Sequence, residues 1–349
     1  LGLRLGEDYS AAFDSTTGFL TITMLAGGKG AAATAIKVSG KVIDPSKVTK
    51  EDVIGAVDPS TGAETGAQVI RQVYPRLGIV PGLILAPGWS QIPEVGLALA
   101  AKAAKINGVY SAMALLDLDT AKAKKYTDTK SVKEESGYTS PFCYPLWPCD
   151  RVGEYILAKS AVAGAMIQYM ASDNEDVPNQ SPSNHLLGVG GQCLEDGTEV
   201  YLDQDQANTV NGYGVTTAIN QNGYRLWGNY TGAYPASSDA KDIWFAVRRM
   251  FSWQGNNFIQ TYFDEVDDPM NNVLVQSVVD SENIRCSAYA PKYWAGASIE
   301  YKSDDNPKTA ILAGTMKFRQ HIAPYTPAQE IVDIIDYDTD TLAAAVGGN

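Results

Sequence analysis

Two kinds of hydrophobic pattern alternate in the first half of the chain. Residues 78–87, "GIVPGLILAP", are almost continuously apolar, which is typical of a strand covered on both faces. Residues 93–107, "PEVGLALAAKAAKIN", are rich in alanine and begin with a proline, which favours the first turn of a helix. Residues 109–119, "VYSAMALLDLD", form a second apolar run that ends in acids. This order predicts strand, helix and parallel strand, and hence an α/β fold.

The second half of the chain shows a helical period. From residue 236, Ile243, Val247, Phe251 and Phe258 fall on one face of an amphipathic helix. The segment 120–140 is polar and charged, which predicts an exposed loop or a short helix. The same patterns predict helices at 154–171 and 268–290, and strands at 18–25, 297–302, 315–322 and 330–340.

Composition narrows the classes of function. A chain of 349 residues is long enough for two or three domains. Its net charge of −13 opposes nonspecific nucleic-acid binding and docking on anionic lipid, because both need a cationic surface. No apolar run reaches the roughly 18 residues of a membrane span, so we predict no membrane insertion.

Motifs for cofactors and metals are incomplete. After Lys29 comes Gly30 rather than the hydroxyl residue of a phosphate-binding loop. The four cysteines are too few for a disulfide framework, and only Cys143 and Cys149 lie close together, so a zinc ribbon lacks its second pair. The sequence therefore predicts no cofactor and no metal site, and the low cysteine count favours a reducing cytosol.

The turn "GLILAPGWSQI", residues 82–92, resembles the strand-to-helix turn that carries a hydrolase nucleophile. That motif needs glycine on both sides of the serine, but Ile92 stands in the second glycine position after Ser90. The chain has only two histidines, His185 and His321, and neither has a carboxylate partner in its sequence context. Ser90 is more simply a residue of a helix N-cap region.

Acidic residues offer weaker candidate sites. Asp117 and Asp119 end a predicted parallel strand, at the edge where α/β proteins often bind ligands. The clusters at 264–268 and 336–340 lack the glycine and glutamate of a calcium loop, so we interpret them as solvated acids. No catalytic residue is predicted. The alternative is an α/β hydrolase or a ligand-binding enzyme that uses the turn at Ser90 together with Asp117 and Asp119.

Several segments, in order, carry a resemblance to a known family. They are "QVYPRLGIVPGLILAPGWS" (72–90), "PNQSPSNHLLG" (178–188), "NGYRLWGNYTGAYP" (222–235), "WFAVRRMFSW" (244–253) and "APYTPAQEIVDIIDYD" (323–338). Together with the alanine-rich helix they resemble the sheath proteins of contractile phage tails, R-type bacteriocins and related phage-like particles. The matching segments span most of residues 65–340.

The resemblance implies a fold and a domain division. It implies a subtilisin-like central α/β domain with a mostly parallel sheet and no protease residues, followed by an α+β C-terminal sheath domain. The corresponding boundaries are an N-terminal β-rich segment at 1–60, the central domain at 61–235 and the C-terminal domain with its arm at 236–349. Family members usually carry an extended N-terminal arm that we do not find, and the chain begins with Leu1 rather than Met, so a front piece is expected to be missing.

The resemblance also implies a structural function and no enzymatic activity. Sheath subunits form hexameric rings that stack helically around an inner tube, and contraction drives the tube through a target cell envelope. The implied partners are other copies of the chain, the inner tail tube protein, and baseplate and tail terminator proteins. The implied location is a virion tail or phage-tail-like particle assembled in the bacterial host cytoplasm. The resemblance does not separate phage, defective prophage, bacteriocin and secretion-system sheaths.

Two sets of contact residues are predicted. Residues 330–342 are β-branched and aromatic with interleaved acids, which favours a strand added to a neighbouring subunit, as the family's terminal arms imply. The alternative is that 330–338 is the last strand of the chain's own sheet. The residues of the inter-subunit strand are Ile331, Val332, Ile334, Ile335 and Tyr337. The basic residues predicted to face the tube are Arg248, Arg249, Lys317 and Arg319.

Overall fold

The computed structural model describes residues 2–14, 17–39 and 44–347, which form two compact units divided after Val48. In the first unit, β1 (Tyr9–Phe13) and β2 (Leu20–Met24) pair antiparallel, which confirms the strand predicted at 18–25. Asp8 is buried beside this hairpin, where its carboxylate accepts hydrogen bonds from the amides of Arg4 and Lys29 at 2.9 and 2.8 Å.

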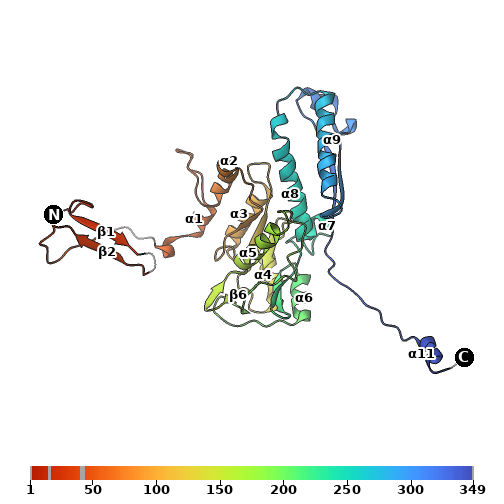
Figure 1. The fold of residues 1–349 in the computed structure, drawn as a ribbon, viewed down its shortest axis with the longest axis horizontal. Helices are drawn as coiled ribbons and strands as arrows, with labels where there is room; N and C mark the ends of the chain where they lie inside the picture. The colour runs from red at the N-terminus through yellow and green to blue at the C-terminus, as the bar shows by residue number, and fades with distance from the viewer. Residues whose placement is uncertain (1, 15–16, 40–43, 348–349) are drawn as a thin grey trace. The chain divides into compact units, whose positions relative to one another are not determined.

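The second unit is built on a three-stranded parallel sheet in the order β3-β4-β5. Its strands are β3 (Leu83–Leu85), β4 (Met113–Asp117) and β5 (Cys143–Leu146), and the helix α3 (Pro93–Ala104) connects the first two. The strand, helix and parallel strand predicted between residues 78 and 119 are therefore confirmed, with shorter strands than the apolar runs (Figure 1).

Helices cover both faces of the parallel sheet. Because side chains alternate along a strand, neighbouring residues of β4 pack against different helices. Ala114 and Leu116 of β4 share a core cluster with α3, whereas Met113 and Leu115 share another with Ile167 of α5 (Lys159–Ser172). A strand buried on both faces has no solvent-facing positions, which explains the continuous apolar run of β4 before Asp117.

Smaller elements surround this layer. Two antiparallel sheets contain β7-β6-β8 and β9-β10. Their strands are β6 (Cys149–Val152), β7 (Tyr155–Leu157), β8 (Gly191–Cys193), β9 (Thr217–Asn220) and β10 (Tyr224–Trp227). The shorter helices are α1 (Lys50–Ile54), α2 (Val73–Leu77), α4 (Thr129–Ser136), α6 (Gln204–Gly212), α7 (Ala240–Ile243), α10 (Lys308–Leu312) and α11 (Thr339–Ala345).

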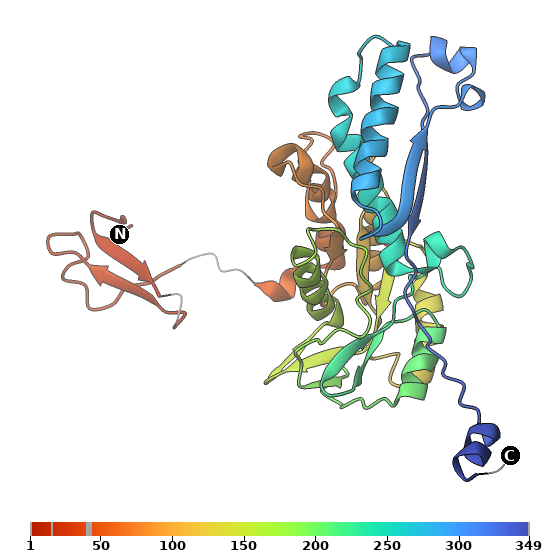
Figure 2. The same ribbon diagram turned by 45° about the vertical axis from the view of Figure 1, so that its right-hand side comes forward.

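Two long helices and a β-hairpin form the C-terminal layer (Figure 2). The helices are α8 (Phe245–Thr261) and α9 (Asn272–Ala288), and the hairpin pairs β11 (Trp294–Glu300) with β12 (Arg319–Pro324). Met250 of α8, Cys286 of α9 and Trp294 of β11 meet in a separate hydrophobic cluster. The helices predicted from 236 and over 268–290, and the strands predicted at 297–302 and 315–322, are confirmed with shifted ends.

Two expectations change in the structure, and one open alternative is decided. The helix predicted at 154–171 begins only at Lys159, because residues 155–157 pair with β6 as β7. The polar segment 120–140 contains the short helix α4, one of the two predicted alternatives, and its buried Val132 gives it an inner face. The strand expected at 330–340 is absent from the chain's own sheets, since residues 325–338 have no strand pairing and α11 begins at Thr339.

No helix among the described residues is both long and apolar enough to cross a membrane. The mixed α/β architecture with a parallel sheet agrees with the predicted fold class. The domain boundaries predicted after residues 60 and 235 stay a prediction.

Candidate functional site

The turn after β3 and the end of β4 meet in a buried polar cluster. Ser90 Oγ donates a hydrogen bond to Asp117 Oδ2 at 3.0 Å and accepts one from the Asp117 amide at 3.0 Å. Ser160, near the start of α5, donates to the same carboxylate from its amide at 2.8 Å and from its hydroxyl at 2.5 Å. Burial raises the pKa of Asp117 above its usual range, although these hydrogen bonds oppose the shift.

The cluster has a structural role. Ser90 and Ser160 are 0% exposed and Asp117 is 7% exposed, so their contacts fasten a turn, a strand end and a helix start to one another. The expectation that Ser90 belongs to a helix N-cap is wrong in detail. The N-cap residue of α3 is Ile92, and the Ser90 hydroxyl bonds to Asp117 instead.

The histidines and the other acids do not complete a catalytic site. His321 lies on β12 with its Nε2 3.1 Å from Glu300 Oε1, and neither histidine hydrogen-bonds to Ser90 among the described residues. Asp119 accepts a hydrogen bond from the Ala121 amide at 2.9 Å, which closes a local turn. Ser90 is fully buried, and the carboxylate that it contacts, Asp117, is also bound by Ser160, so no substrate can reach the hydroxyl and this geometry does not favour the hydrolase alternative.

The described acidic clusters do not bring potential metal ligands together. Within residues 2–14, 17–39 and 44–347, no group of three or more His, Cys, Asp or Glu side chains is placed to hold a metal ion. In the 336–340 cluster, Asp338 caps α11 by accepting hydrogen bonds from the amides of Asp340 and Thr341 at 3.1 and 2.9 Å.

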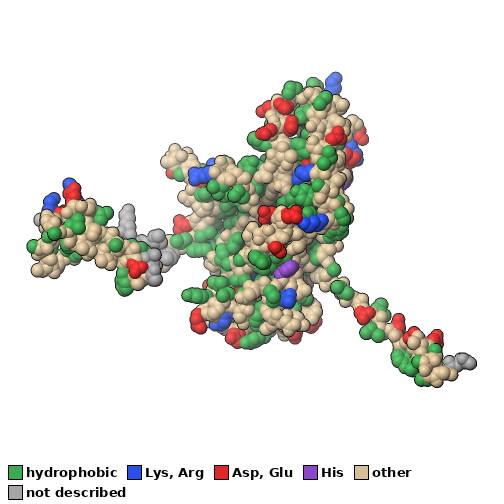
Figure 3. Space-filling view, in the orientation of Figure 1, with side chains coloured by type: hydrophobic (Ala, Val, Ile, Leu, Met, Phe, Trp, Pro, Cys, Tyr) green, Lys and Arg blue, Asp and Glu red, His purple; other side chains and the backbone are tan. Residues whose placement is uncertain are grey.

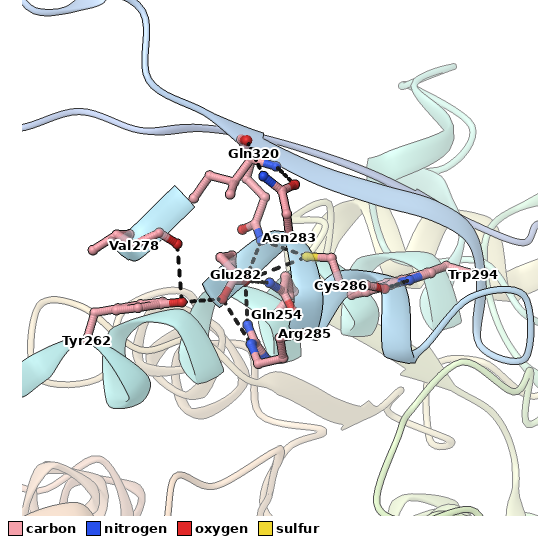
Figure 4. A network of polar contacts seen from close by, with 10 residues as sticks. Gln254, Tyr262, Val278, Glu282, Asn283, Arg285, Cys286, Trp294 and Gln320 are labelled. Atoms are coloured by element: carbon pink, nitrogen blue, oxygen red, sulfur yellow. Dashed lines mark hydrogen bonds and ion pairs between the residues drawn. The ribbon is translucent and has the colours of Figure 1, made fainter. Parts of the chain in front are cut away.

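A second polar network lies inside the C-terminal layer and is centred on Glu282 of α9 (Figure 4). Arg285 donates to both carboxylate oxygens, from Nη2 at 2.6 Å and from Nε at 2.9 Å. Gln254 of α8 donates to Glu282 Oε1 at 2.5 Å, and Gln320 of β12 donates to the same oxygen at 2.8 Å. The Tyr262 hydroxyl donates to Oε2 at 3.2 Å. One fully buried carboxylate therefore connects α8, α9 and β12.

The electrostatics of this network favour the ionised acid. Burial acts to raise the pKa of Glu282, but the hydrogen bonds and charge of Arg285, with those of Gln320 and Gln254, outweigh it and hold the pKa below its usual range. Sequence reasoning missed Glu282. The signal was present, because the buried residues of α9 recur every four positions as Leu274, Val278, Glu282 and Cys286, which places an acid in an apolar stripe.

The basic residues predicted to face a tube lie in two places. Arg248 and Arg249 are half-buried on α8, and Arg248 Nη1 lies 3.2 Å from Asp242 Oδ1. Lys317 and Arg319 are exposed at the start of β12, where Arg319 donates to both oxygens of Asp305 at 2.9 and 2.6 Å. The structure does not bring the four together as one set, and their contact with a tube stays a prediction.

The predicted inter-subunit strand pairs with no other strand in the part of the chain that the structure describes. The backbone of residues 325–338 forms no strand, although Tyr325 and Gln329 bond to Pro291 and Tyr230. The apolar side chains beyond these anchors are exposed, with Ile331 at 89% and Ile335 at 87%. We call residues 330–349 the C-terminal arm.

Comparison with known proteins finds relatives that are all tail sheath proteins. No protein-family model matches the sequence. The chain is 26% identical to the tail sheath protein of Burkholderia phage BcepMu, in an alignment that covers 99% of this chain and 72% of that protein. It is 24% identical to the tail sheath protein of Escherichia phage P2, over 81% of this chain and 69% of that protein.

Solved structures share the fold. The PVC sheath complex of an extracellular contractile injection system, in its contracted state, matches with a TM-score of 0.62 and 17% identity, covering 79% of this chain and 76% of that one. A chain of the anti-feeding prophage baseplate matches with a TM-score of 0.60 and 17% identity, covering 86% of this chain and 83% of that one.

These relatives are structural proteins, and the buried serine cluster gives no reason to assign an activity to this chain. Similarity along almost the whole chain thereby supports the resemblance that the ordered segments suggested. Over almost its whole length the chain is therefore similar to contractile tail sheath proteins, which are structural proteins and not enzymes.

Proposed function

We propose that this chain polymerises into a contractile sheath around an inner tail tube, and that contraction drives the tube through a target cell envelope. The support is its similarity to phage tail sheath proteins and to a sheath complex in a contracted state. The single observation that carries the proposal is the C-terminal arm, whose apolar side chains are exposed and unpaired in the isolated chain.

The hairpin of β11 and β12 offers a place for such an arm. The Asn283 side chain covers the outer edge of β11, since it accepts from the Ile299 amide and donates to the Ile299 carbonyl, both at 3.0 Å. The Ile299 backbone therefore points away from β12. Because Ile299 lies opposite Gln320, the antiparallel alternation turns the backbone groups of Gln320 and Ile322 toward the outer edge of β12.

An open edge of this kind accepts another strand. We propose that the arm of one subunit pairs with the outer edge of β12 in a neighbour, by β-augmentation. With about 1 kcal/mol net per backbone hydrogen bond, a five-bond addition contributes on the order of 5 kcal/mol per junction. Asp333 and Asp336 in the arm disfavour pairing with wrong partners before assembly.

The remaining assignments follow the same proposal. The partners are other copies of this chain, the inner tail tube protein, and the baseplate and terminator proteins, in a virion tail or phage-tail-like particle assembled in the bacterial cytoplasm. The central domain, at 61–235, has a subtilisin-like fold, flanked by the segment 1–60 and the sheath domain 236–349. Of the basic residues proposed to face the tube, Lys317 and Arg319 are the exposed pair.

Truncation tests the proposal. A chain lacking residues 331–349 is expected to keep its thermal unfolding midpoint, because residues 331–347 have exposed side chains, but to form no sheath-like polymers in negative-stain images. A chain of full length in which 331–338 are replaced by glycine and serine should behave in the same way. A chain lacking only residues 346–349 is the matched control and should polymerise. Normal sheaths from the first two variants would refute the proposed junction.

A further inference from the structure

A large hollow lies between α8 and the start of the parallel strands β3 and β4. Its volume is about 730 Å³. From α8 it is lined by Arg249, Ser252, Trp253 and Asn257, and the opposite wall includes the apolar segment 79–85. We call this cavity the α8 hollow.

Two hydrogen-bond donors in the α8 hollow have no acceptor. The guanidinium of Arg249 forms no ion pair or hydrogen bond with any residue that the structure describes, and its ring neighbour is Phe245, at 5.6 Å from the centroid. Ser252, one turn further along α8, is 6% exposed, and its Oγ has no hydrogen-bond partner in the described structure. Asp176 also lines the hollow but makes no ion pair with Arg249.

Such donors indicate an anionic ligand. Ser252 Oγ is buried without an acceptor, which costs about 1–3 kcal/mol, and the half-buried Arg249 adds a positive charge beside it. Burial lowers the pKa of Arg249 to about 10, so the guanidinium is still charged at neutral pH. A carboxylate that enters the hollow can accept hydrogen bonds from both Arg249 and Ser252, which lie on the same face of α8.

The chain carries an unpaired acidic surface at the far end of the same helix. We call residues 263–268, between α8 and α9, the acidic tip. Its acids are Asp264, Glu265, Asp267 and Asp268, none of which forms an ion pair with a described residue. Its apolar members are also exposed, Phe263 at 63% and Val266 at 64%. Figure 3 shows acidic side chains gathered at this end of the two long helices.

The tip cannot fill the hollow of its own chain. Arg249 lies in the second turn of α8, whereas Asp264 follows the end of that helix at Thr261, and the 12 residues from Arg249 to Thr261 alone correspond to roughly 18 Å at about 1.5 Å per residue. Because α8 is rigid, an acidic tip that reaches Arg249 must come from another molecule. Contacts between two different faces of identical chains build rings where the rotation closes and open helical assemblies where it does not.

We propose that the α8 hollow receives the acidic tip of a second copy of this chain. A tip carboxylate accepts hydrogen bonds from Arg249 and Ser252, and the exposed Phe263 and Val266 pack against the apolar wall formed by residues 79–85. This inference rests on the proposed function, because it requires copies of the chain to assemble with one another. It concerns a contact separate from the C-terminal arm and β12.

Charge exchange tests the contact. Arg249→Glu, or Asp264→Arg together with Asp268→Arg, is expected to reduce the polymer recovered by sedimentation by about tenfold or more. Combining all three substitutions in one chain should restore most of it. Lys105 is exposed and does not line the α8 hollow, so Lys105→Glu makes the same charge change as Arg249→Glu and should leave assembly unaltered. Wild-type yields from Arg249→Glu, or no rescue in the combined variant, would overturn the proposal.

Crosslinking separates this contact from a folding defect and from failure of the proposed function. Chains carrying Asn257→Cys are mixed with chains carrying Asp268→Cys and oxidised with copper phenanthroline, and mixed dimers are identified by mass spectrometry. We expect a crosslink between 257 and 268 and none when Asp268→Cys is exchanged for Ser277→Cys on exposed α9. If the wild type forms no polymer, the proposed function fails, but a crosslinked pair in concentrated solution still supports the contact. Absence of that pair contradicts it.

Discussion

The apolar segments 113–117 and 331–337 contain similar kinds of side chain and have opposite surroundings. In β4, Met113 and Leu115 are fully buried between the sheet and α5. In the C-terminal arm, Ile331 and Ile335 are almost fully exposed. The first segment is completed by its own chain, whereas the second has no strand partner among the described residues and, in our proposal, is completed by another molecule. This difference teaches that stability and assembly are carried by separate parts of the sequence.

The largest effect on stability is expected in the parallel sheet. Leu115→Ala removes a side chain packed between β4 and α5, so it should lower the free energy of unfolding by about 3 kcal/mol. Urea denaturation of a chain lacking 331–349 measures this without interference from assembly. A loss below about 1 kcal/mol would show that the sheet is not the main source of stability.

A smaller loss is expected in the C-terminal layer. Glu282→Gln leaves the Arg285 charge without its carboxylate and places an amide against the Gln254 and Gln320 donors, which should cost about 2 kcal/mol. The control Glu135→Gln changes an exposed acid of α4 and should cost almost nothing. Equal unfolding midpoints for the two variants would contradict a supporting role for the network.

The stabilising contributions of the two buried carboxylates, Glu282 and Asp117, should change in opposite directions as the pH falls. The pKa of Glu282 is held low in the folded chain, so its stabilising contribution is present above the unfolded value of about 4.3 and is lost as pH falls through the folded value. The pKa of Asp117 is raised by burial, so its contribution is present below about 3.9 and is lost as pH rises through the folded value.

The measurement for these signs is the unfolding free energy of wild type, Glu282→Gln and Asp117→Asn between pH 7 and pH 3. The advantage of wild type over Glu282→Gln should shrink toward pH 3. Relative to Asp117→Asn, wild type should gain stability over the same range. Two differences that move in the same direction would contradict this assignment of charge states.

The smallest effect on the monomer is expected in the C-terminal arm. Ile335→Ala removes an exposed side chain, so the free energy of unfolding should change by less than about 0.5 kcal/mol. Its polymers should nevertheless dissociate at a lower denaturant concentration than those of wild type, as light scattering would show. A monomer strongly destabilised by Ile335→Ala would mean that the arm packs against its own chain.

The sequence was a good guide where a segment is completed locally. The apolar run that ends at Asp117 predicted a buried parallel strand, and the alanine-rich segment after Pro93 predicted α3. It was a poor guide for short strands such as β9, whose four residues are too few to show a period. It also misplaced the start of α5, because residues 155–157 are apolar enough for either state.

The candidate sites were also predictable only as far as they depend on residues close together in the sequence. The missing glycine at Ile92 correctly weakened the interpretation of Ser90 as a nucleophile, but the bonds from Ser90 and Ser160 to Asp117 join residues far apart in the chain. No local pattern reveals such a meeting. For residues 330–338 the alternation was that of a strand, but a sequence pattern does not state which molecule supplies the partner.

Hydrogen exchange at the amides of residues 331–338 tests the central claim most directly. In the monomer these amides should exchange at the rate of an unstructured peptide, because the structure gives them no strand partner. In assembled sheaths, alternate amides of the segment should be protected by a factor of about a thousand, as expected for roughly 4 kcal/mol of pairing. Amides that stay unprotected in the polymer, or that are already protected in the monomer, would contradict strand exchange between subunits.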